Sequence, residues 1–281
     1  DDIASICEAF YENSRTEQLT IPTNCLLPDK IIGHTEEILK RCKNLYLQLQ
    51  LSIDGTEAEH DRIRQVDGAS KKLLTTYNGL NSLRKRFKQF EINFCCTFSK
   101  FNQDSIGRIY DFLKLRGNTN LSLLLTRGVV KNETVKEFDI DKYVMWLKHL
   151  LRLQLKEPRT LSEILFLIRR NYQTRIIYKV MKDNNYRFHC AAGRLTAVID
   201  ECGAVYPCEM TNTTFGSLRE QNYNFSKIWN SNLANQFRDQ IHYDKCRCTH
   251  ETNIITNIAF SPLYLSKIIS RALYEKLKLS F

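Results

Sequence analysis

Four cysteines in the C-terminal third of the chain have the side-chain chemistry and the spacing of a metal centre. They are Cys190, Cys208, Cys246 and Cys248. Thiolates bind soft metals, and four of them satisfy either a tetrahedral zinc ion or a 4Fe-4S cluster. Zinc ribbons usually use paired Cys-x2-Cys knuckles, and neither half of this set has that spacing. The spacing therefore favours iron and sulfide, with zinc as the alternative.

The other thiols and the nearby imidazoles are weaker candidates. Cys202 lies in a predicted hairpin turn and is an alternative ligand. Three histidines flank the cysteines, although solvated or helix-capping roles are favoured over metal binding. They are His189, His242 and His250. The remaining cysteines fall within helix or strand patterns, where a free thiol packs as a small hydrophobe. They are Cys7, Cys25, Cys42, Cys95 and Cys96.

A hairpin and a helix must bring the distant thiols together. A strand over residues 195–200, a turn at residues 201–203 and a second strand over residues 204–207 lead to Cys208. A helix over residues 226–241 then precedes the last two cysteines. If the hairpin folds back on the loop after this helix, the four sulfurs converge.

The N-terminal half alternates strand patterns with helix patterns. The predicted strands cover Leu19–Ile21, Leu45–Ile53, Phe90–Phe98 and Leu121–Thr126. The predicted helices cover Thr35–Lys43, Ala69–Gln89 and Ser105–Arg116. Alternation of this kind predicts βαβ crossovers and a parallel sheet. The strands are nearly continuous in apolar character, which predicts a sheet covered on both faces.

Four strands are too few to close a barrel. The chain begins with Asp1 and a helix pattern, so we expect a fragment with further βα units upstream. Further on, the pattern predicts helices over Ile140–Leu155 and Leu161–Lys182, with Thr160 as the N-cap of the second. A basic amphipathic helix is predicted over Leu263–Leu279.

Composition narrows the class of protein. The 281 residues are 43% hydrophobic, which is enough to bury a core without disulfides and disfavours a secreted disulfide scaffold. No apolar run reaches the roughly 18 residues that span a bilayer, and the N-terminus lacks a signal-peptide pattern. The net charge of +10 is scattered along the chain, which disfavours specific nucleic-acid binding. We therefore expect a cytoplasmic protein with no membrane partner.

The cysteine-rich segment resembles a known family. Cys190, twelve residues, Gly203, four residues and Cys208 match the opening of the SPASM or twitch domains that follow radical S-adenosylmethionine (SAM) barrels. The companion phrases are Val198-Ile199-Asp200, Val205-Tyr206-Pro207-Cys208-Glu209, Phe215-Gly216-Ser217-Leu218 and Ile228-Trp229-Asn230-Ser231. Upstream phrases look like the third and fourth strands of such a barrel and the loop after them. They are Ile21-Pro22-Thr23-Asn24, Leu51-Ser52-Ile53-Asp54-Gly55 and His60-Asp61-Arg62-Ile63-Arg64.

The resemblance implies an α/β fold class. It implies a partial (β/α) radical SAM barrel with parallel strands, followed by a small α+β SPASM/twitch domain. The partial barrel would cover residues 1–135, a helical linker residues 136–186, and the cysteine-rich domain with its C-terminal helix residues 187–281. In such a domain the glycine at position 203 makes the hairpin turn, and the four cysteines bind an auxiliary 4Fe-4S cluster.

The resemblance also implies a cofactor site at the end of the fourth-strand match. Ser52 and Arg64 look like the residues that contact the amino-acid end of SAM, since a guanidinium forks onto a carboxylate. Asp54 either joins this site or caps the Asp-Gly turn. Asn102 is a further pocket candidate. Without the resemblance, Ser52 and Asp54 are interpreted as the end of a strand and the start of a turn.

The implied activity is that of a radical SAM oxidoreductase or maturase acting on a peptide or a small molecule. In such enzymes a flavodoxin or ferredoxin reduces a catalytic 4Fe-4S cluster, SAM is cleaved, and a 5'-deoxyadenosyl radical abstracts hydrogen from the substrate. The CxxxCxxC motif and the glycine-rich segment of that family are absent from this sequence. We expect both on an upstream segment, so the chain alone could not cleave SAM. Thr252 stands where similar domains often have a further cysteine, which puts the occupancy of the auxiliary cluster in question.

Two other functions stay open. A noncatalytic metal-binding scaffold derived from such an enzyme would lack the radical-generating unit. A zinc-stabilised nucleic-acid-binding protein would hold zinc instead of iron. An upstream CxxxCxxC motif would favour the enzyme, and a colourless protein that holds only zinc would favour the last alternative.

Overall fold

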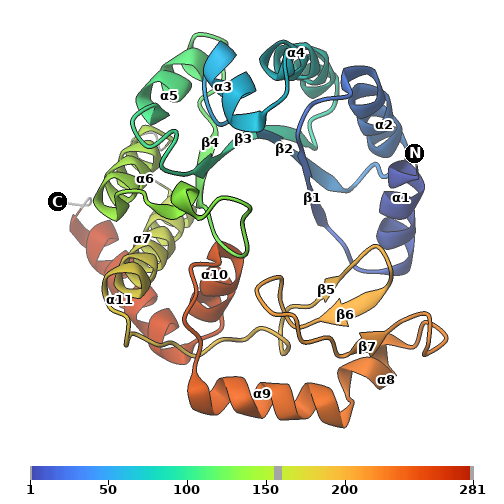
Figure 1. The fold of residues 1–281 in the computed structure, drawn as a ribbon, viewed down its shortest axis with the longest axis vertical. Helices are drawn as coiled ribbons and strands as arrows, with labels where there is room; N and C mark the ends of the chain where they lie inside the picture. Colours follow the sequence, from blue (N-terminus) through green and yellow to red (C-terminus); the bar gives the residue numbers. More distant parts are fainter. Residues whose placement is uncertain (1, 155–159, 279–281) are drawn as a thin grey trace. The chain divides into compact units, whose positions relative to one another are not determined.

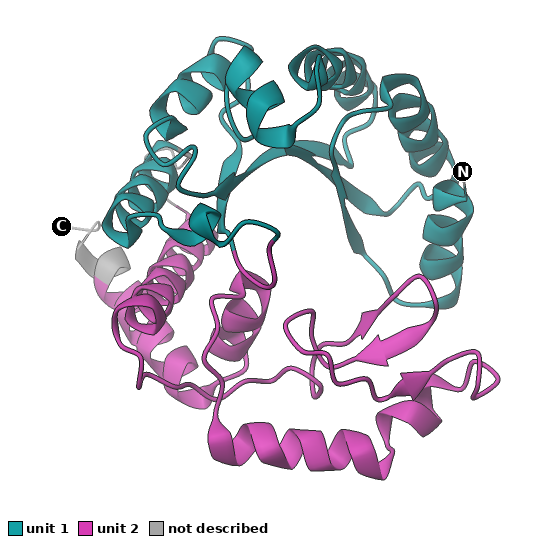
Figure 2. Ribbon diagram, viewed as in Figure 1, with its two compact units in different colours: residues 1–126, 131–154 teal, residues 127–130, 155–281 magenta. Residues whose placement is uncertain are grey.

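The structure is a computed structural model that describes residues 2–154 and 160–278. The chain forms two compact units (Figure 2). Unit 1 comprises residues 1–126 and 131–154, and unit 2 comprises residues 127–130 and 155–281. Each unit has its own sheet. No helix in the described ranges is both long enough and apolar enough to cross a membrane.

A parallel four-stranded sheet organises unit 1. Its strands, in the order of the sheet, are β1 (Gln18–Thr23), β2 (Tyr46–Ser52), β3 (Phe90–Phe98) and β4 (Leu121–Leu125). Every neighbouring pair is parallel, so each connection must cross from one end of the sheet to the other. The prediction of an α/β fold with a parallel sheet is confirmed. The described strands form an open sheet and not a closed barrel.

Helices lie along one face of this sheet (Figure 1). The helices of unit 1 are α1 (Ile3–Asn13), α2 (Pro28–Arg41), α3 (Glu57–Arg64), α4 (Ala69–Arg86), α5 (Ile106–Lys114) and α6 (Ile140–Gln154), with a 3-10 turn η1 (Glu133–Lys136). The helix predicted from Thr35 begins earlier, at Pro28, because proline is well suited to the first turn of a helix.

The loop expected at residues 60–64 is a helix instead. This helix, α3, has Glu57 and Glu59 in its first turn and Arg62 and Arg64 in its last turn. Acidic groups at the start and basic groups at the end of a helix complement its dipole, which stabilises a short helix that has no apolar stripe. Periodicity could not detect this helix, because its sequence is almost entirely polar.

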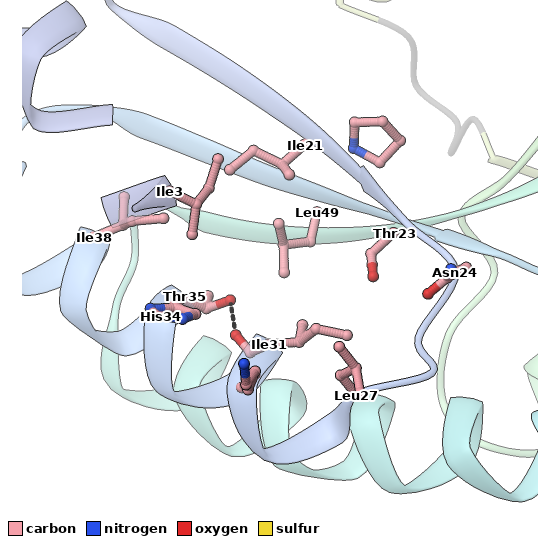
Figure 3. Close-up of a pocket in the computed structure, with 12 residues that line it drawn as sticks. Ile3, Ile21, Thr23, Asn24, Leu27, Ile31, His34, Thr35, Ile38 and Leu49 are labelled. Carbon is pink, nitrogen blue, oxygen red and sulfur yellow. Dashed lines mark hydrogen bonds between the residues drawn. The ribbon is translucent and has the colours of Figure 1, made fainter. Parts of the chain in front are cut away.

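The expectation of strands covered on both faces is met by β3, in which residues 92–96 are all buried, but not by β2. Along β2 the residues alternate between buried and half-buried, with Leu49 and Leu51 buried and Gln50 and Ser52 half-buried. Leu49 points toward α2 (Figure 3). The register places Gln50 beside Asn93 of β3. In β2 the face opposite the helices is therefore polar, and period-two alternation was the signal for it.

Unit 2 combines a group of helices with a small antiparallel sheet. Its helices are α7 (Leu161–Lys182), α8 (Phe225–Trp229), α9 (Asn232–Asp244), α10 (Glu251–Ala259) and α11 (Pro262–Lys278). Its strands, β5 (Val198–Ile199), β6 (Ala204–Tyr206) and β7 (Gly216–Ser217), form one sheet in that order. α7 packs against both α10 and α11. The predicted hairpin is confirmed as the antiparallel pair of β5 and β6.

Capping side chains set two helix starts in unit 2. Thr160 Oγ1 accepts a hydrogen bond from the Glu163 N–H at 3.2 Å, and the Glu163 carboxylate accepts one from the Thr160 N–H at 2.7 Å. The predicted N-cap of α7 is therefore confirmed. The single helix predicted over residues 226–241 is wrong, because the chain leaves the helix at Asn230 and Ser231 caps a new one, α9.

Other helix predictions have mixed outcomes. The helix α10, which begins at Glu251 shortly after the last cysteines, was not predicted. The helix predicted from Leu263 is confirmed as α11. The predicted ends at Leu155 and Leu279 lie outside the described residues.

A buried arginine completes the core under the small sheet. The apolar residues of this core are Val205, Phe215, Ile228 and Ala234. Arg238 Nε donates to the Gly193 carbonyl and Nη2 donates to the Trp229 carbonyl, each at 2.6 Å. Because a buried guanidinium needs acceptors, these bonds fix α9 against the loop that follows Cys190.

Candidate functional site

A backbone bridge in unit 2 brings two of the candidate cysteines close. The Phe188 N–H donates to the Cys246 carbonyl at 2.9 Å, and the Cys246 N–H donates to the Phe188 carbonyl at 2.7 Å. This antiparallel bridge lies just before Cys190. In the hairpin, Gly203 adopts a φ of +86°, which favours glycine, and the turn directs β6 toward Cys208.

The four sulfurs interact with one another. The Cys246 thiol forms hydrogen bonds with Cys190 and with Cys248. Cys208 interacts electrostatically with Cys190 and with Cys248. Pairwise interactions thus link the four candidate ligands. Within residues 2–154 and 160–278, no group of three or more His, Cys, Asp or Glu side chains has an arrangement that could hold a metal ion.

Shared protons give this thiol group thiolate character. The hydrogen bond with Cys246 lowers the pKa of Cys190 to about 6, assisted by the Ala192 N–H and opposed by burial. The same partner lowers the pKa of Cys248. The pKa of Cys246 itself is raised, because its proton serves both neighbours. Burial raises the pKa of Cys208. Metals bind the thiolate form, and the lowered pKa values of Cys190 and Cys248 favour that form.

Backbone N–H groups point at three of the sulfurs. In each case the donor is the residue two positions further along the chain. The pairs are Ala192 with Cys190, Met210 with Cys208, and His250 with Cys248. Hydrogen bonds to ligand sulfurs are a feature of iron–sulfur sites, where they tune the reduction potential. Both the donor set and its surroundings therefore fit a cluster.

Asn257 of α10 adds a side-chain donor beside the thiols. Its Oδ1 accepts a hydrogen bond from the Ala191 N–H at 2.7 Å, which sets the orientation of the amide. Its Nδ2 is buried without a partner of ordinary hydrogen-bond geometry, and the amide lowers the pKa of Cys190. A buried amide N–H of this kind would find an acceptor in a cluster sulfur. Sequence reasoning missed Asn257, because it lies on a helix that was not predicted.

His250 caps a helix and is not placed as a metal ligand. Its Nδ1 accepts a hydrogen bond from the Asn253 N–H at 3.1 Å, at the start of α10. Its Nε2 lies 2.8 Å from Glu209 Oε1. Burial lowers the pKa of His250, so the ring is neutral with its proton on Nε2. Both nitrogens are occupied, and the capping interpretation is confirmed.

The other weak candidates lie apart from these contacts. Cys202 is exposed in the turn, where its N–H donates to Asp200 Oδ1 at 3.0 Å. His189 and His242 are exposed, with ring centroids 5.5 Å apart. Thr252 is exposed on α10. The cysteines interpreted as small hydrophobes are all buried, namely Cys7, Cys25, Cys42, Cys95 and Cys96.

An arginine that sequence reasoning did not select lies beside the thiols. Arg127 belongs to unit 2 and contacts the carboxylates that follow two of the ligands. Its Nη2 lies 2.8 Å from Glu209 Oε1, and its Nη1 pairs with Glu251 Oε2. Arg127 also interacts electrostatically with Cys248 and helps to lower the pKa of that thiol. Arg127 lies far upstream of the cysteines in the sequence, so no spacing rule could predict its place beside them.

A second polar group lies at the carboxyl end of the sheet in unit 1. Asp54 is 5% exposed, and its Oδ1 accepts a hydrogen bond from the Thr97 N–H at 2.9 Å. Arg64 Nε lies 2.7 Å from Asp54 Oδ2, as an ion pair whose N–H is not directed along a hydrogen bond. The carboxyl ends of parallel strands are the usual place for ligand sites in α/β folds.

Asn102 joins this group through its amide. Its Nδ2 donates to the Asp54 carbonyl at 3.2 Å and to the Thr97 carbonyl at 3.0 Å, and its Oδ1 accepts from the Ser99 N–H at 2.8 Å. Asn102 is 1% exposed. The structure therefore brings Asp54, Arg64 and Asn102 together. Ser52 lies at the end of β2, on its half-exposed polar face.

The loop after β2 requires a glycine. A Cβ on Gly55 would lie 2.7 Å from Glu59 Cγ and 2.8 Å from the His60 nitrogen. This close approach lets α3 pack directly on the loop, and His60 Nδ1 accepts a hydrogen bond from the Asp54 N–H at 3.1 Å. His60 is 1% exposed, and burial lowers its pKa from 6.5.

We expect His60 to make folding sensitive to acid. Its folded pKa lies below the unfolded value of 6.5, so the stability that it contributes is present above that pH and is lost as the pH falls below it. His60→Asn keeps an acceptor near the position of Nδ1 but does not titrate. The free energy of unfolding in urea is measured at about pH 7.5 and about pH 5.5. The difference between the two values should be about 1 kcal/mol smaller in His60→Asn than in the wild type. His34→Asn, on α2, serves as the control, and an equal change in both variants would contradict the assignment.

A pocket of about 330 Å³ lies elsewhere in unit 1, between β1, β2 and α2 (Figure 3). Its lining includes the apolar side chains of Ile21, Ile31 and Leu49. The Thr35 hydroxyl in its wall donates to the Ile31 carbonyl at 2.6 Å. Neither the four thiols nor Asp54 lines this pocket, so it is separate from both polar groups.

Comparison with known families identifies the thiol segment. Residues 190–249 match the SPASM family, which is described as an iron-sulfur cluster-binding domain. The matched range contains all four candidate ligands. The resemblance of this segment to a SPASM domain is thereby confirmed. No curated protein sequence matches the chain.

Solved structures with a similar course of the backbone also exist. One is native anSMEcpe with bound AdoMet, at 14% identity and a TM-score of 0.47, covering 84% of this chain and 72% of that chain. Another is native anSMEcpe with bound AdoMet and Cp18Cys peptide, at 14% identity and a TM-score of 0.48, covering 84% of this chain and 73% of that chain.

Proposed function

We propose that Cys190, Cys208, Cys246 and Cys248 bind a 4Fe-4S cluster, and that this is the auxiliary cluster of a radical SAM enzyme. The observation that carries the proposal is that four thiols, linked by pairwise interactions, lie within a segment that matches an iron-sulfur cluster-binding domain. Backbone N–H groups directed at three of the sulfurs add the donors that such clusters use. When bound, the cluster would supply electron transfer or a binding site for substrate.

The proposed enzyme is an oxidoreductase or maturase that modifies a peptide or a small molecule by 5'-deoxyadenosyl radical chemistry. Its catalytic 4Fe-4S cluster would require cysteines outside this sequence, which contains no CxxxCxxC motif. A flavodoxin or ferredoxin is the proposed electron donor, and the cytoplasm is the proposed compartment. The proposed division into a partial barrel, a linker and a cysteine-rich domain at residues 135 and 186 belongs to the same hypothesis.

The polar group at the end of the sheet would position SAM. Arg64 is held by Asp54, and 30% of its side chain is exposed, so its outer nitrogens would donate to the carboxylate of SAM. Ser52, on the polar face of β2, would contact the same end of the cofactor. Asn102 is bonded to the backbone of both loops and would hold the shape of the site.

Anaerobic reconstitution with ferrous iron and sulfide tests the cluster. We expect the purified chain to take up about four iron and four sulfide per molecule, as a 4Fe-4S cluster requires. A chain that takes up zinc alone and stays colourless would contradict the proposal and would favour a zinc-stabilised nucleic-acid-binding protein.

The complete protein tests the enzyme. After reconstitution and reduction, we expect it to release 5'-deoxyadenosine from SAM, measured by chromatography. A complete protein that holds its auxiliary cluster but releases no 5'-deoxyadenosine would instead be a noncatalytic scaffold.

A further inference from the structure

Arg127 joins two loops that carry ligands. Glu209 follows Cys208 directly, and Glu251 comes shortly after Cys248. Arg127 contacts Glu209 through Nε at 3.2 Å and Nη2 at 2.8 Å, and it contacts Glu251 through Nη1. A guanidinium has a rigid set of donors, which suits it to hold two carboxylates in a fixed relation. The arginine therefore ties the hairpin half of the thiol group to the half that precedes α10.

The two ion pairs differ in their surroundings. The Glu251 side chain is 8% exposed, whereas that of Glu209 is 49% exposed. Solvent screens the Glu209 pair and weakens it, while the Glu251 pair lies in a medium of lower effective dielectric. Gln173 Nε2 also donates to the Glu251 carbonyl at 2.9 Å, which anchors the start of α10 to α7. The buried pair is therefore the stronger part of this connection.

Charge near the thiols follows from the same contacts. Arg127 interacts electrostatically with Cys248. Its guanidinium is a permanent cation beside ligands that become anionic when they bind metal. A positive charge close to a cluster favours its reduced form, because reduction adds negative charge.

We propose that Arg127 is a positioning residue for the cluster: it holds the Cys208 and Cys248 loops together through Glu209 and Glu251, and its charge raises the reduction potential of the cluster. This inference rests on the proposed cluster. It adds a residue that lies far from the cysteine motif and outside residues 190–249.

Three substitutions separate the charge from the geometry. Arg127→Met removes both, so we expect a lower midpoint potential in an EPR-monitored redox titration and about tenfold faster loss of iron to a chelator. Arg127→Lys keeps the charge but lacks the planar guanidinium that contacts both carboxylates. We therefore expect a near-normal midpoint potential with faster loss of iron. Glu251→Gln removes a buried negative charge, so we expect the potential to rise. Arg238→Lys is the matched control, because Arg238 is buried in the same unit but bonds to neutral acceptors.

Opposite signs for Arg127→Met and Glu251→Gln support the proposal. A shift of the same sign in both, or an equal shift in Arg238→Lys, would mean that a loosened fold is responsible and would overturn it. In the metal-free chain, the melting temperature of the double variant Arg127→Met/Glu251→Gln should lie close to that of Arg127→Met alone. Fully additive losses would overturn the contact itself. The two proposals can fail separately. If the melting temperatures are not additive but the wild-type chain takes up no iron, the proposed function is wrong, while the contact of Arg127 with the two loops is still supported.

Discussion

Replacing Cys208 by serine is expected to reduce the iron and sulfide bound after anaerobic reconstitution by about tenfold or more. Changes in the residues around metal ligands already cost about 10- to 100-fold in affinity, and loss of a ligand removes a bond to the metal itself. Serine is close in size to cysteine, so the hairpin should fold as before. Iron and sulfide analysis, together with the visible absorption of the cluster, measures the outcome.

The turn of the same hairpin provides the control for this substitution. Cys202 is exposed and lies outside the contacts that join the other four thiols, so Cys202→Ser should retain the iron content of the wild type. Equal losses in Cys202→Ser and Cys208→Ser would show that the ligand set is wrong. Retention of full iron in both would show that Cys208 is not a ligand.

Asp54→Ala is expected to lower the free energy of unfolding by about 2 to 4 kcal/mol. The substitution leaves the Thr97 N–H without its acceptor and Arg64 without its ion-pair partner. A buried donor that loses its partner costs roughly 1 to 3 kcal/mol, and an uncompensated charge costs more. The Arg64 side chain is 30% exposed, so water can solvate the guanidinium and reduce the cost of the uncompensated charge.

Two further variants separate the roles of the Asp54 carboxylate. Asp54→Asn keeps an acceptor for Thr97 but loses the charge, so a cost of about 1 to 2 kcal/mol is expected in urea unfolding. Asp67→Ala, at an exposed position after α3, should change stability by less than about 0.5 kcal/mol. If Asp54→Ala were as stable as the wild type, the carboxylate would have no part in holding β2, β3 and α3 together.

The candidate metal ligands could be selected from the sequence because cysteine chemistry leaves few alternatives. Cys190, Cys208, Cys246 and Cys248 were selected from residue type and spacing, and the hairpin that carries Cys208 was selected from its turn residues. The parallel sheet was predictable for a similar reason, since short apolar strands alternated with amphipathic helices. Local sequence was sufficient in both cases.

Residues that act through contacts distant in sequence were not predictable. Arg127 and Asn257 lie far from the cysteines along the chain or on an unpredicted helix, and no spacing rule connects them to the thiols. The helix α3 was missed because its stabilising charges follow no apolar period. The packing of α3 on the loop after β2 nevertheless places Arg64 in an ion pair with Asp54.

The sequence by itself determined which side chains can bind metal and which segments form strands, because both depend on residue type and on neighbours a few positions away. Only the tertiary structure decided which protons the thiols share and which charges stand beside them. Those properties depend on burial and on partners brought close by folding, as for Cys246 between Cys190 and Cys248. The polar face of β2 is an intermediate case: its alternation is present in the sequence, but the position of the helices decides which face is fully buried.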